Sequence, residues 1–357
     1  MDESNAVNSR SNRACFAGTR IVLRQLSPES EPIYDFIVAL HKHSNGDYDA
    51  LAKEAGLSQE ELEAYLNYAA QFLGNLGNYK SFGDSKFVPR LEPRQLKALA
   101  TTSKEALGFY EQFKDAIFAG DDVAKLHLGY PSAGHVSTYY PDSPTITKED
   151  ITGVSDFLES KGLLPENTRI RKTNDGFEVL VASAFDNPSS EQRDLKESEW
   201  TLEDGKKVRL VFGDYSKEMD LIAHHIDEAK KHTANDNQVK MMDEYAKSFR
   251  TGSLEAFKES QRAWIMDKGP TVESDIGFIE TYRDPHGIRG EWEGFVAMVN
   301  KERTKAFSKL VESAPQYIPK LPWDKEFEKD KFLSPDFTSL EVLTFAGSGQ
   351  VTGTSRS

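Results

Sequence analysis

A carboxylate and a phenol lie two residues apart in the segment IGFIETYRDP, at Glu280 and Tyr282. The run IGFIE (276–280) has the β-branched and aromatic character of a strand, and side chains two residues apart on a strand project to the same face. A carboxylate can pair with an ammonium group, and a neighbouring hydroxyl can donate a hydrogen bond to a carbonyl oxygen or to its oxyanion. The pair therefore suits the amino terminus of a peptide, although an ordinary surface glutamate beside a half-buried tyrosine is the alternative interpretation.

Charged residues crowd the turn that follows Tyr282, which Pro285 and Gly287 shape. These charged residues are Arg283, Asp284, Arg289, Glu291 and Glu293. Alternating charges around such a turn are typical of a structural ion-pair network. Arg283 is also a candidate for the binding site, because it is the neighbour of Tyr282 in the sequence.

A helix-borne zinc site is absent from the sequence. Such sites place a general-base glutamate directly after the first of two histidines, and none of the eight histidines is followed by glutamate. His225, Glu228 and His232 have the spacing of one helix face, but the lysines around them are typical of a solvent-exposed face. We therefore expect no metal ligands in this chain.

The composition is that of a globular, acidic protein, with 357 residues, 38% hydrophobic residues and a formal net charge of −14. This balance argues against binding to the phosphate backbone of nucleic acids.

The single cysteine, Cys15, permits no intramolecular disulfide. The N-terminal residues lack the apolar core of a secretory signal, and no apolar run approaches the roughly 18 residues of a membrane span. We expect no membrane association and a cytoplasmic location.

Helices dominate the first half of the expected fold. Residues 1–14 are polar and are expected to be flexible. Apolar residues at helical spacing predict a helix from Glu31 to His43, and Ser58 with Glu61 forms a capping box before a longer helix. Further helices are expected at about 103–119, from about 147 to 161, and within 216–266.

Strand signals replace the helical pattern in the middle of the chain. Two Asp-Gly pairs stand between alternating apolar residues, in 169–185 and 200–212, and each predicts a hairpin. Two hairpins predict a small antiparallel sheet or barrel. After the strand at 276–280, the apolar pattern of 292–314 predicts an amphipathic helix. The predicted fold class is therefore α+β.

Several stretches of the sequence resemble the dipeptidyl-peptidase III family of zinc aminopeptidases. They are GNYKSFGDSKFVPR (77–90), WIMDKGPTVESDIGFIETYRDPHGIRGEWEGFVAMVNK (264–301), LPWDKEFEKDKFLSPDFTSLEVLTFAGSG (321–349) and, more loosely, the helical region 217–263. Their order and spacing also match the family. The resemblance implies the N-terminal half of a two-lobed enzyme, in which one lobe has helices and a five-stranded β-barrel and the other is helical and holds zinc.

The resemblance also implies where the lobes divide. Residues 15–300 would form the barrel lobe, 301–338 would begin the zinc lobe, and 339–349 would return to the barrel lobe. The remaining residues, 350–357, fall outside the family pattern.

The resemblance further implies roles for individual residues. In the family, the glutamate that matches Glu280 anchors the free amino group of the peptide, and the tyrosine that matches Tyr282 supports the transition state, which makes Tyr282 the catalytic candidate. The strand that begins at FAGSG and includes Gly349 pairs with the substrate backbone. Zinc activates water, with a glutamate as general base. The implied activity is a metallopeptidase that releases N-terminal dipeptides from short peptides, with Glu280, Tyr282, Arg283 and Gly349 as the substrate-binding candidates.

The sequence departs from the family after Gly349, where it reads QVTGTSRS. The zinc ligands and the general base would lie beyond this point, so the family's zinc is not expected to bind this chain. Intron read-through, a splice variant or an early stop would produce such a change. We therefore expect a truncated chain that is inactive as a peptidase on its own. A non-catalytic peptide-binding fragment and an incomplete gene model are the alternatives.

Overall fold

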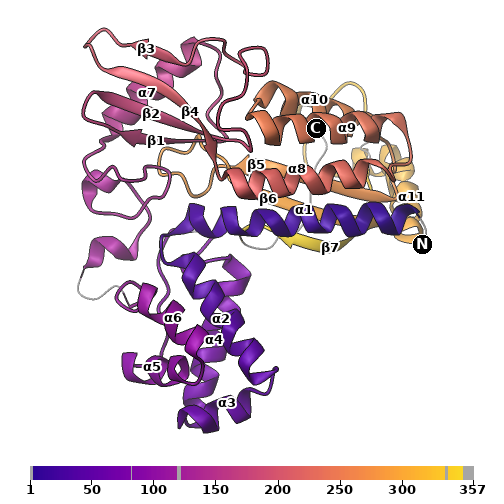
Figure 1. Ribbon diagram of the computed structural model, residues 1–357. Helices are drawn as coiled ribbons and strands as arrows, with labels where there is room; N and C mark the ends of the chain where they lie inside the picture. Colours follow the sequence, from indigo (N-terminus) through magenta and orange to yellow (C-terminus); the bar gives the residue numbers. More distant parts are fainter. Residues whose placement is uncertain (1–2, 82, 119–121, 334–336, 349–357) are drawn as a thin grey trace.

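The structure is a computed structural model that describes residues 3–81, 83–118, 122–333 and 337–348. Within these residues the chain forms eleven α-helices and seven β-strands, arranged in two sheets. Figure 1 shows a helical group at the bottom, a four-stranded sheet with α7 (Lys148–Ser160) at the upper left, and a second sheet alongside a layer of long helices. The predicted α+β class is confirmed.

Five helices form the helical group. They are α2 (Ser30–Ser44), α3 (Tyr48–Ala55), α4 (Gln59–Asn75), α5 (Pro93–Thr101) and α6 (Lys104–Phe113). The buried Phe36 makes T-shaped ring contacts with Tyr65 (centroids 6.5 Å apart) and Phe113 (5.2 Å). The predicted capping box is confirmed, since the Glu61 N–H donates to Ser58 Oγ (3.3 Å) and the Ser58 N–H donates to the Glu61 carboxylate (2.7 Å).

The first sheet has the strand order β1–β2–β4–β3. Its strands are β1 (Thr168–Lys172), β2 (Gly176–Ala182), β3 (Glu199–Thr201) and β4 (Lys207–Asp214). Both predicted hairpins are confirmed, because β1 pairs antiparallel with β2 and β3 pairs antiparallel with β4. β2 and β4 run parallel, so the sheet is mixed. Ile151 and Val154 of α7 share a buried apolar core with Val179 and Val208 of this sheet.

The second sheet has the order β5–β6–β7, and both neighbouring pairs are antiparallel. Its strands are β5 (Val272–Glu280), β6 (Glu291–Val299) and β7 (Leu340–Ala346). The strand expected at 276–280 is confirmed as the end of β5. The helix expected over 292–314 is wrong in its first part, because β6 extends to Val299 and α11 (Lys301–Tyr317) begins only after it. Most of β6 is buried on both faces, so its apolar residues do not alternate and imitate helical spacing.

The expected antiparallel β-barrel is corrected to two open sheets. β1 and β3 are the edges of the first sheet and β5 and β7 those of the second, and no strand of the described residues joins the two. Helices cover the sheets instead, so the cores are closed without a ring of strands (Figure 1).

The first helix, α1 (Glu3–Leu26), packs on β6 and lies beside α8 (Ser216–Lys230). α9 (Asp236–Thr251) and α10 (Leu254–Met266) complete this helical layer. Most of the segment expected to be flexible, 1–14, belongs to this helix from Glu3 onward. Small and polar residues, such as the fully buried Ser11 and Ala14, line the packed face and give a weak apolar signal in the sequence. Neither α1 nor another helix of the described residues is both long and apolar enough to cross a membrane.

Small residues let α1 approach β6 closely. A Cβ added to Gly18 would lie 1.7 Å from Trp292 Nε1, and one added to Gly294 would lie 3.0 Å from Cys15 Sγ. The Cys15 thiol donates a hydrogen bond to the Gly294 carbonyl (2.8 Å). Burial raises the pKa of this thiol to about 12, so Cys15 acts in packing rather than as a reactive thiolate.

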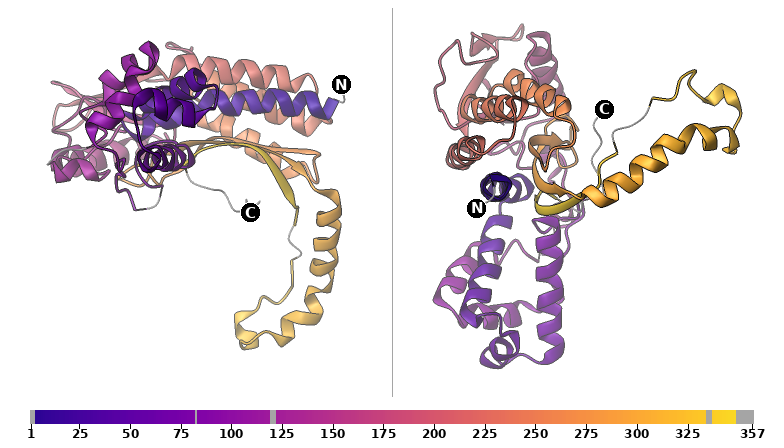
Figure 2. Two further views of the ribbon diagram at one scale, coloured as in Figure 1. Left: turned by 90° about the horizontal axis from the view of Figure 1, so that it is seen from below. Right: turned by 90° about the vertical axis from the view of Figure 1, so that its right-hand side faces the viewer.

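α11 leads away from the rest of the molecule, and residues 318–333 continue from its end to complete an arm, 301–333 (Figure 2). Every residue of α11 is described and none of them is buried. Large apolar side chains are exposed along this arm, including Leu310, Trp323, Phe327 and Leu333. The assignment of 301–338 to a second lobe stays a prediction.

Gly18→Ala should destabilise the protein by about 1–3 kcal/mol, because the added methyl group overlaps the Trp292 ring and forces α1 or β6 to shift. The measurement is the free energy of unfolding in urea. Gly108→Ala is the matched control, since this glycine of α6 has nothing within 4 Å of an added Cβ. That change should stabilise the protein by up to about 1 kcal/mol. Equal effects of the two substitutions would contradict the close contact.

Candidate functional site

Three glutamates meet where β5 ends and β6 begins. Glu280, the last residue of β5, is paired with Glu291, the first residue of β6. Glu293 lies two residues further along β6, opposite Gly277, and so shares a strand face with Glu291. Glu280 and Glu293 are partly exposed, whereas Glu291 is buried. This end of the strand pair therefore concentrates negative charge that solvent reaches at two of the three residues.

A turn held by Asp284 connects β5 to β6. The Asp284 carboxylate accepts hydrogen bonds from the backbone N–H groups of His286 (3.1 Å), Ile288 (3.1 Å) and Arg289 (3.0 Å), and from the Tyr140 hydroxyl (2.6 Å). The fully buried guanidinium of Arg289 lies 3.7 Å from Asp284. The structural ion-pair interpretation is thus confirmed for these two residues, and the turn fixes the position at which β6 starts.

Arg283 is 3% exposed and lies next to the buried glutamate of the cluster. Its Nε atom is 3.4 Å from Glu291 Oε2, and its Nη2 donates to the Asn75 carbonyl (3.4 Å). Glu291 also accepts a hydrogen bond from Ser348 Oγ (2.9 Å). Burial raises the pKa of Glu291, and Arg283 and Ser348 oppose this rise. Arg283 therefore neutralises a buried carboxylate that also holds the segment after β7, and its role in substrate binding stays a prediction.

Tyr282 lies beyond the end of β5. The expectation that Tyr282 and Glu280 share one strand is therefore wrong. The two side chains nevertheless meet, because the Tyr282 hydroxyl donates a hydrogen bond to the Glu280 carboxylate. The tyrosine is 44% exposed. Burial, followed by the charges of Glu280 and Glu293, raises the pKa of the Tyr282 hydroxyl. The hydroxyl therefore remains a hydrogen-bond donor at neutral pH.

Glu293 is a strongly perturbed carboxyl group. Burial, followed by the charges of Glu291, Glu280 and Asp275, raises its pKa from 4.5 to about 8. Among the described residues, the cation paired with this cluster is Arg283, at Glu291. Three neighbouring carboxyl groups and one guanidinium leave an excess of negative charge, so the cluster holds a proton at neutral pH and favours a bound cation.

Glu280 and Tyr282 come together as predicted, whereas Glu293, predicted to belong to the ion-pair network of the charged turn, lies on β6 and joins the carboxyl cluster. The face that Glu291 and Glu293 share was hidden because the segment from residue 292 was expected to be helical. Two glutamates spaced by two residues, opposite a strand that ends in glutamate, are the signal that could have revealed it. The fourth candidate, Gly349, lies outside the described residues.

Comparison with known proteins identifies the family. The sequence profile of Peptidase family M49 matches residues 109–355. The chain belongs to Peptidase family M49. Dipeptidyl peptidase 3 of Mus musculus is 44% identical over 353 residues, and that of Dictyostelium discoideum is 42% identical over 339 residues. The alignments cover 95% and 94% of this chain but 47% of each relative, so the chain spans about half the length of the curated relatives it matches. The resemblance to the dipeptidyl-peptidase III family is confirmed.

A solved structure described as DPP III from Caldithrix abyssi is similar to this M49 chain in fold. The TM-score is 0.56 at 15% sequence identity, and the match covers 97% of this chain and 49% of that chain. At this identity the likeness concerns the fold alone.

The described residues of this M49 chain do not fit a zinc ion. No group of three or more His, Cys, Asp or Glu residues among them is placed to hold a metal. In the histidine-rich part of α8, Glu228 pairs with Lys231, and His232 lies beyond the helix end.

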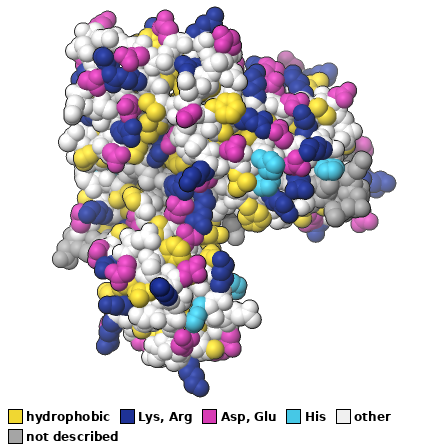
Figure 3. All heavy atoms as spheres, viewed as in Figure 1, with side chains coloured by type: hydrophobic (Ala, Val, Ile, Leu, Met, Phe, Trp, Pro, Cys, Tyr) yellow, Lys and Arg dark blue, Asp and Glu magenta, His cyan; other side chains and the backbone are white. Residues whose placement is uncertain are grey.

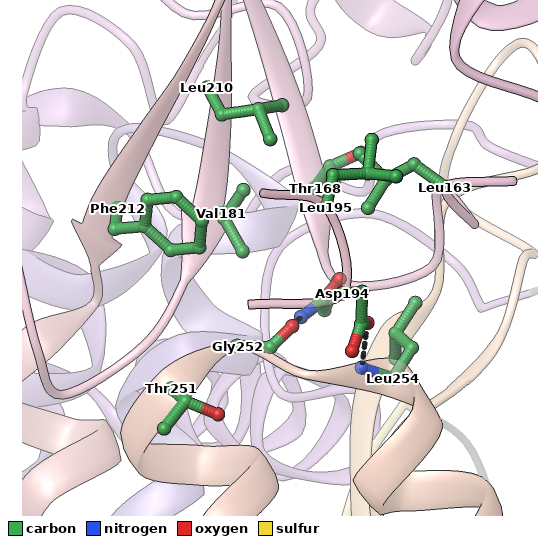
Figure 4. Close-up of a pocket in the computed structure, with 11 residues that line it drawn as sticks. Leu163, Thr168, Val181, Asp194, Leu195, Leu210, Phe212, Thr251, Gly252 and Leu254 are labelled. Carbon is green, nitrogen blue, oxygen red and sulfur yellow. Dashed lines mark hydrogen bonds between the residues drawn. The ribbon is translucent and has the colours of Figure 1, made fainter. Parts of the chain in front are cut away.

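A small cavity lies between the first sheet and the start of α10 (Figure 4). Its volume is about 10 Å³, enough for at most one water molecule. Asp194 at its edge accepts a hydrogen bond from the Leu254 N–H (2.7 Å) and so caps α10. This cavity is a packing feature of the M49 chain. The candidate site remains the cluster of Glu280, Glu291 and Glu293, called the acid cluster below.

Arg283→Met should lower the free energy of unfolding by about 3–5 kcal/mol, because it leaves the Glu291 carboxylate buried without its counter-charge. Adding Glu291→Met removes the unpaired charge and should restore most of the lost stability. Urea denaturation measures both variants. A double variant no more stable than the single one would show that the pair does not stabilise the fold in this way.

The raised pKa of Glu293 predicts a pH-dependent stability. Between 4.5, its ordinary value, and about 8, its value in the fold, the folded chain holds a proton that the unfolded chain has lost. The free energy of unfolding therefore falls as pH rises through this window. Glu293→Gln stays neutral, so its stability relative to the natural protein should increase from acidic pH to about pH 8.

Urea denaturation over this pH range measures the effect. Glu302→Gln, at an exposed carboxylate of α11, is the control and should follow the natural protein. Parallel pH profiles for Glu293→Gln and the natural protein would show that Glu293 titrates normally.

Proposed function

We propose that this chain supplies the peptide-binding part of a metallopeptidase that releases N-terminal dipeptides from short peptides. The observation that carries the proposal is the hydrogen-bonded pair of Glu280 and Tyr282 beside Glu293, in a cluster with an excess of negative charge. Membership of Peptidase family M49 and the name of the relatives, Dipeptidyl peptidase 3, support the reaction class.

In this proposal the ammonium group of the peptide binds beside Glu280. The carboxylate pairs with the ammonium group through charge-assisted hydrogen bonds. The bound positive charge also favours the ionised form of Glu293, so binding releases the proton that Glu293 holds at neutral pH. The protonated hydroxyl of Tyr282 donates a hydrogen bond to a peptide carbonyl oxygen, or to the oxyanion that develops there during hydrolysis.

The backbone of the peptide is proposed to extend along the edge of the second sheet. β7 is an edge strand, and its N–H and C=O groups can pair with one more extended chain. The Ser348 hydroxyl donates a hydrogen bond to Glu291 and so joins the segment after β7 to the acid cluster. Gly349 would continue this segment beside the bound peptide.

We assign no hydrolytic step to these 357 residues alone. No histidine of the sequence is followed by glutamate, as the helix-borne zinc motif requires. The zinc and the general base of the family are, in this proposal, held by residues outside this sequence. A non-catalytic peptide-binding role is the second candidate, because the Glu280 carboxylate can accept hydrogen bonds from an ammonium group. A cytoplasmic location stays a prediction.

Glu280→Ala should weaken the binding of a short peptide at least about tenfold, because it removes a charged partner of the ammonium group, worth about 1.5–3 kcal/mol. Isothermal titration calorimetry with a tetrapeptide measures the affinity. Acetylation of the peptide amino terminus should cause a similar loss with the natural chain and little further loss with Glu280→Ala.

A control variant and a separate hydrolysis assay complete this experiment. Glu302→Ala removes an exposed carboxylate of α11 and should leave the affinity unchanged. A chromogenic dipeptide substrate tests hydrolysis separately, and the 357-residue chain should release no dipeptide. Equal binding of the free and acetylated peptides would overturn the proposed role of Glu280, whereas release of dipeptide would overturn the absence of a hydrolytic step.

A further inference from the structure

A shallow groove lies between α1 and α8. These two helices lie on the side of the molecule that faces the viewer in Figures 1 and 3. The volume of the groove is about 430 Å³, within the range of small ligand and side-chain pockets. Both helices contribute to its lining, α1 with Arg13, Phe16 and Arg20 and α8 with Lys217, Leu221 and His225. None of these residues belongs to the acid cluster described above.

Two apolar side chains of the groove are exposed. Phe16 is 63% exposed and Leu221 is 46% exposed, and they come from different helices but line the same hollow. Single exposed apolar residues are ordinary on protein surfaces. Two of them in one concave site, surrounded by charge, resemble the anchor pockets of protein interfaces, where a partner's apolar side chain is desolvated.

The rim of the groove is basic, in a protein whose formal net charge is −14. Arg20 and Arg24 are neutralised by Asp35 and Glu31, but Arg13 and Lys217 form no ion pair among the described residues. One residue that lines the groove, Glu218, is acidic, and its carboxylate is paired with Arg24. Glu228, near His225 on α8, is paired with Lys231.

The histidine of the groove is held in a positive environment. Burial, followed by His224, Arg13 and Arg10, lowers the pKa of His225, and Glu228 opposes this shift. Its Nδ1 atom is buried without a hydrogen-bond partner in the part of the chain that the structure describes. The positive charge that Arg13 and Arg10 place around His225 would be neutralised by an anionic partner.

We infer that this groove docks an acidic amphipathic helix of a partner protein. An apolar side chain of the partner would lie between Phe16 and Leu221, and its carboxylates would meet Arg13 and Lys217. Helices with an apolar stripe commonly bind in grooves of this kind. An anionic membrane is the less favourable occupant, because the net charge of the protein opposes approach to it and the apolar residues lie within a concave site.

The test uses the 357-residue chain and a fluorescein-labelled helical peptide of about 16 residues, with leucines along one face and glutamates on the others. Fluorescence anisotropy measures its binding, and a matched peptide with lysine in place of every glutamate is the comparison. The acidic peptide should bind saturably and more weakly as salt is raised from about 50 to about 300 mM, and the basic peptide should not bind.

Two double variants locate the binding site. Arg13→Glu with Lys217→Glu, both exposed, should weaken binding of the acidic peptide at least about tenfold. Lys301→Glu with Lys305→Glu makes the same change of charge on exposed residues of α11 and should leave binding nearly unchanged. Circular dichroism verifies that both variants are folded.

Absence of binding, or equal binding of the acidic and basic peptides, would overturn the inference. Equal losses in the two double variants would overturn it as well, because they would reflect overall charge rather than the groove. Binding to phosphatidylserine vesicles without binding to the acidic peptide would assign the groove to a membrane and equally overturn the proposed partner.

Discussion

The contact between α1 and β6 is the constraint on which the candidate site depends. Helix and strand touch at two glycines, where Gly18 lies against Trp292 and Gly294 lies against Cys15. The Cys15–Gly294 hydrogen bond joins residues 279 positions apart in the sequence. An added side chain would overlap Trp292 at Gly18 and crowd Cys15 at Gly294, so these glycines allow the helix to lie directly against β6 and to fix its position. β6 in turn carries Glu291 and Glu293, so the geometry of the acid cluster follows from small residues that have no chemical role themselves.

The acid cluster is electrostatically unfavourable in isolation. Burial and mutual repulsion raise the pKa values of Glu291 and Glu293, and Arg283 neutralises part of the charge. Such strain is common at functional sites, where a fold maintains charges that a ligand later neutralises. A peptide ammonium group would supply the missing positive charge, and Tyr282 beside it would supply a hydrogen-bond donor. The proposed function therefore explains why carboxyl groups are gathered at a place where they weaken the fold.

The sequence predicted the features that depend on neighbouring residues. The capping box at Ser58 and Glu61, both Asp-Gly hairpins and the strand that ends at Glu280 follow from local rules. Prediction from the sequence failed where packing between distant segments decides the secondary structure. β6 was expected to be helical because burial on both faces removes the alternation of a strand, and the helical start of α1 was missed because its packed face is made of small and polar residues. The same failure misplaced Glu293, which was assigned to the charged turn and whose position beside Glu280 follows only once β6 is paired with β5.

The measurement that tests the central claim most directly is a ¹³C NMR titration of the Glu293 side-chain carboxyl, alone and with a short peptide. The account predicts a pKa of about 8 without peptide, a lower pKa when a peptide with a free amino terminus is bound, and no change with the acetylated peptide. A pKa near the ordinary 4.5 in the free protein, or an equal shift with both peptides, would contradict the claim that this cluster is built to receive a peptide ammonium group.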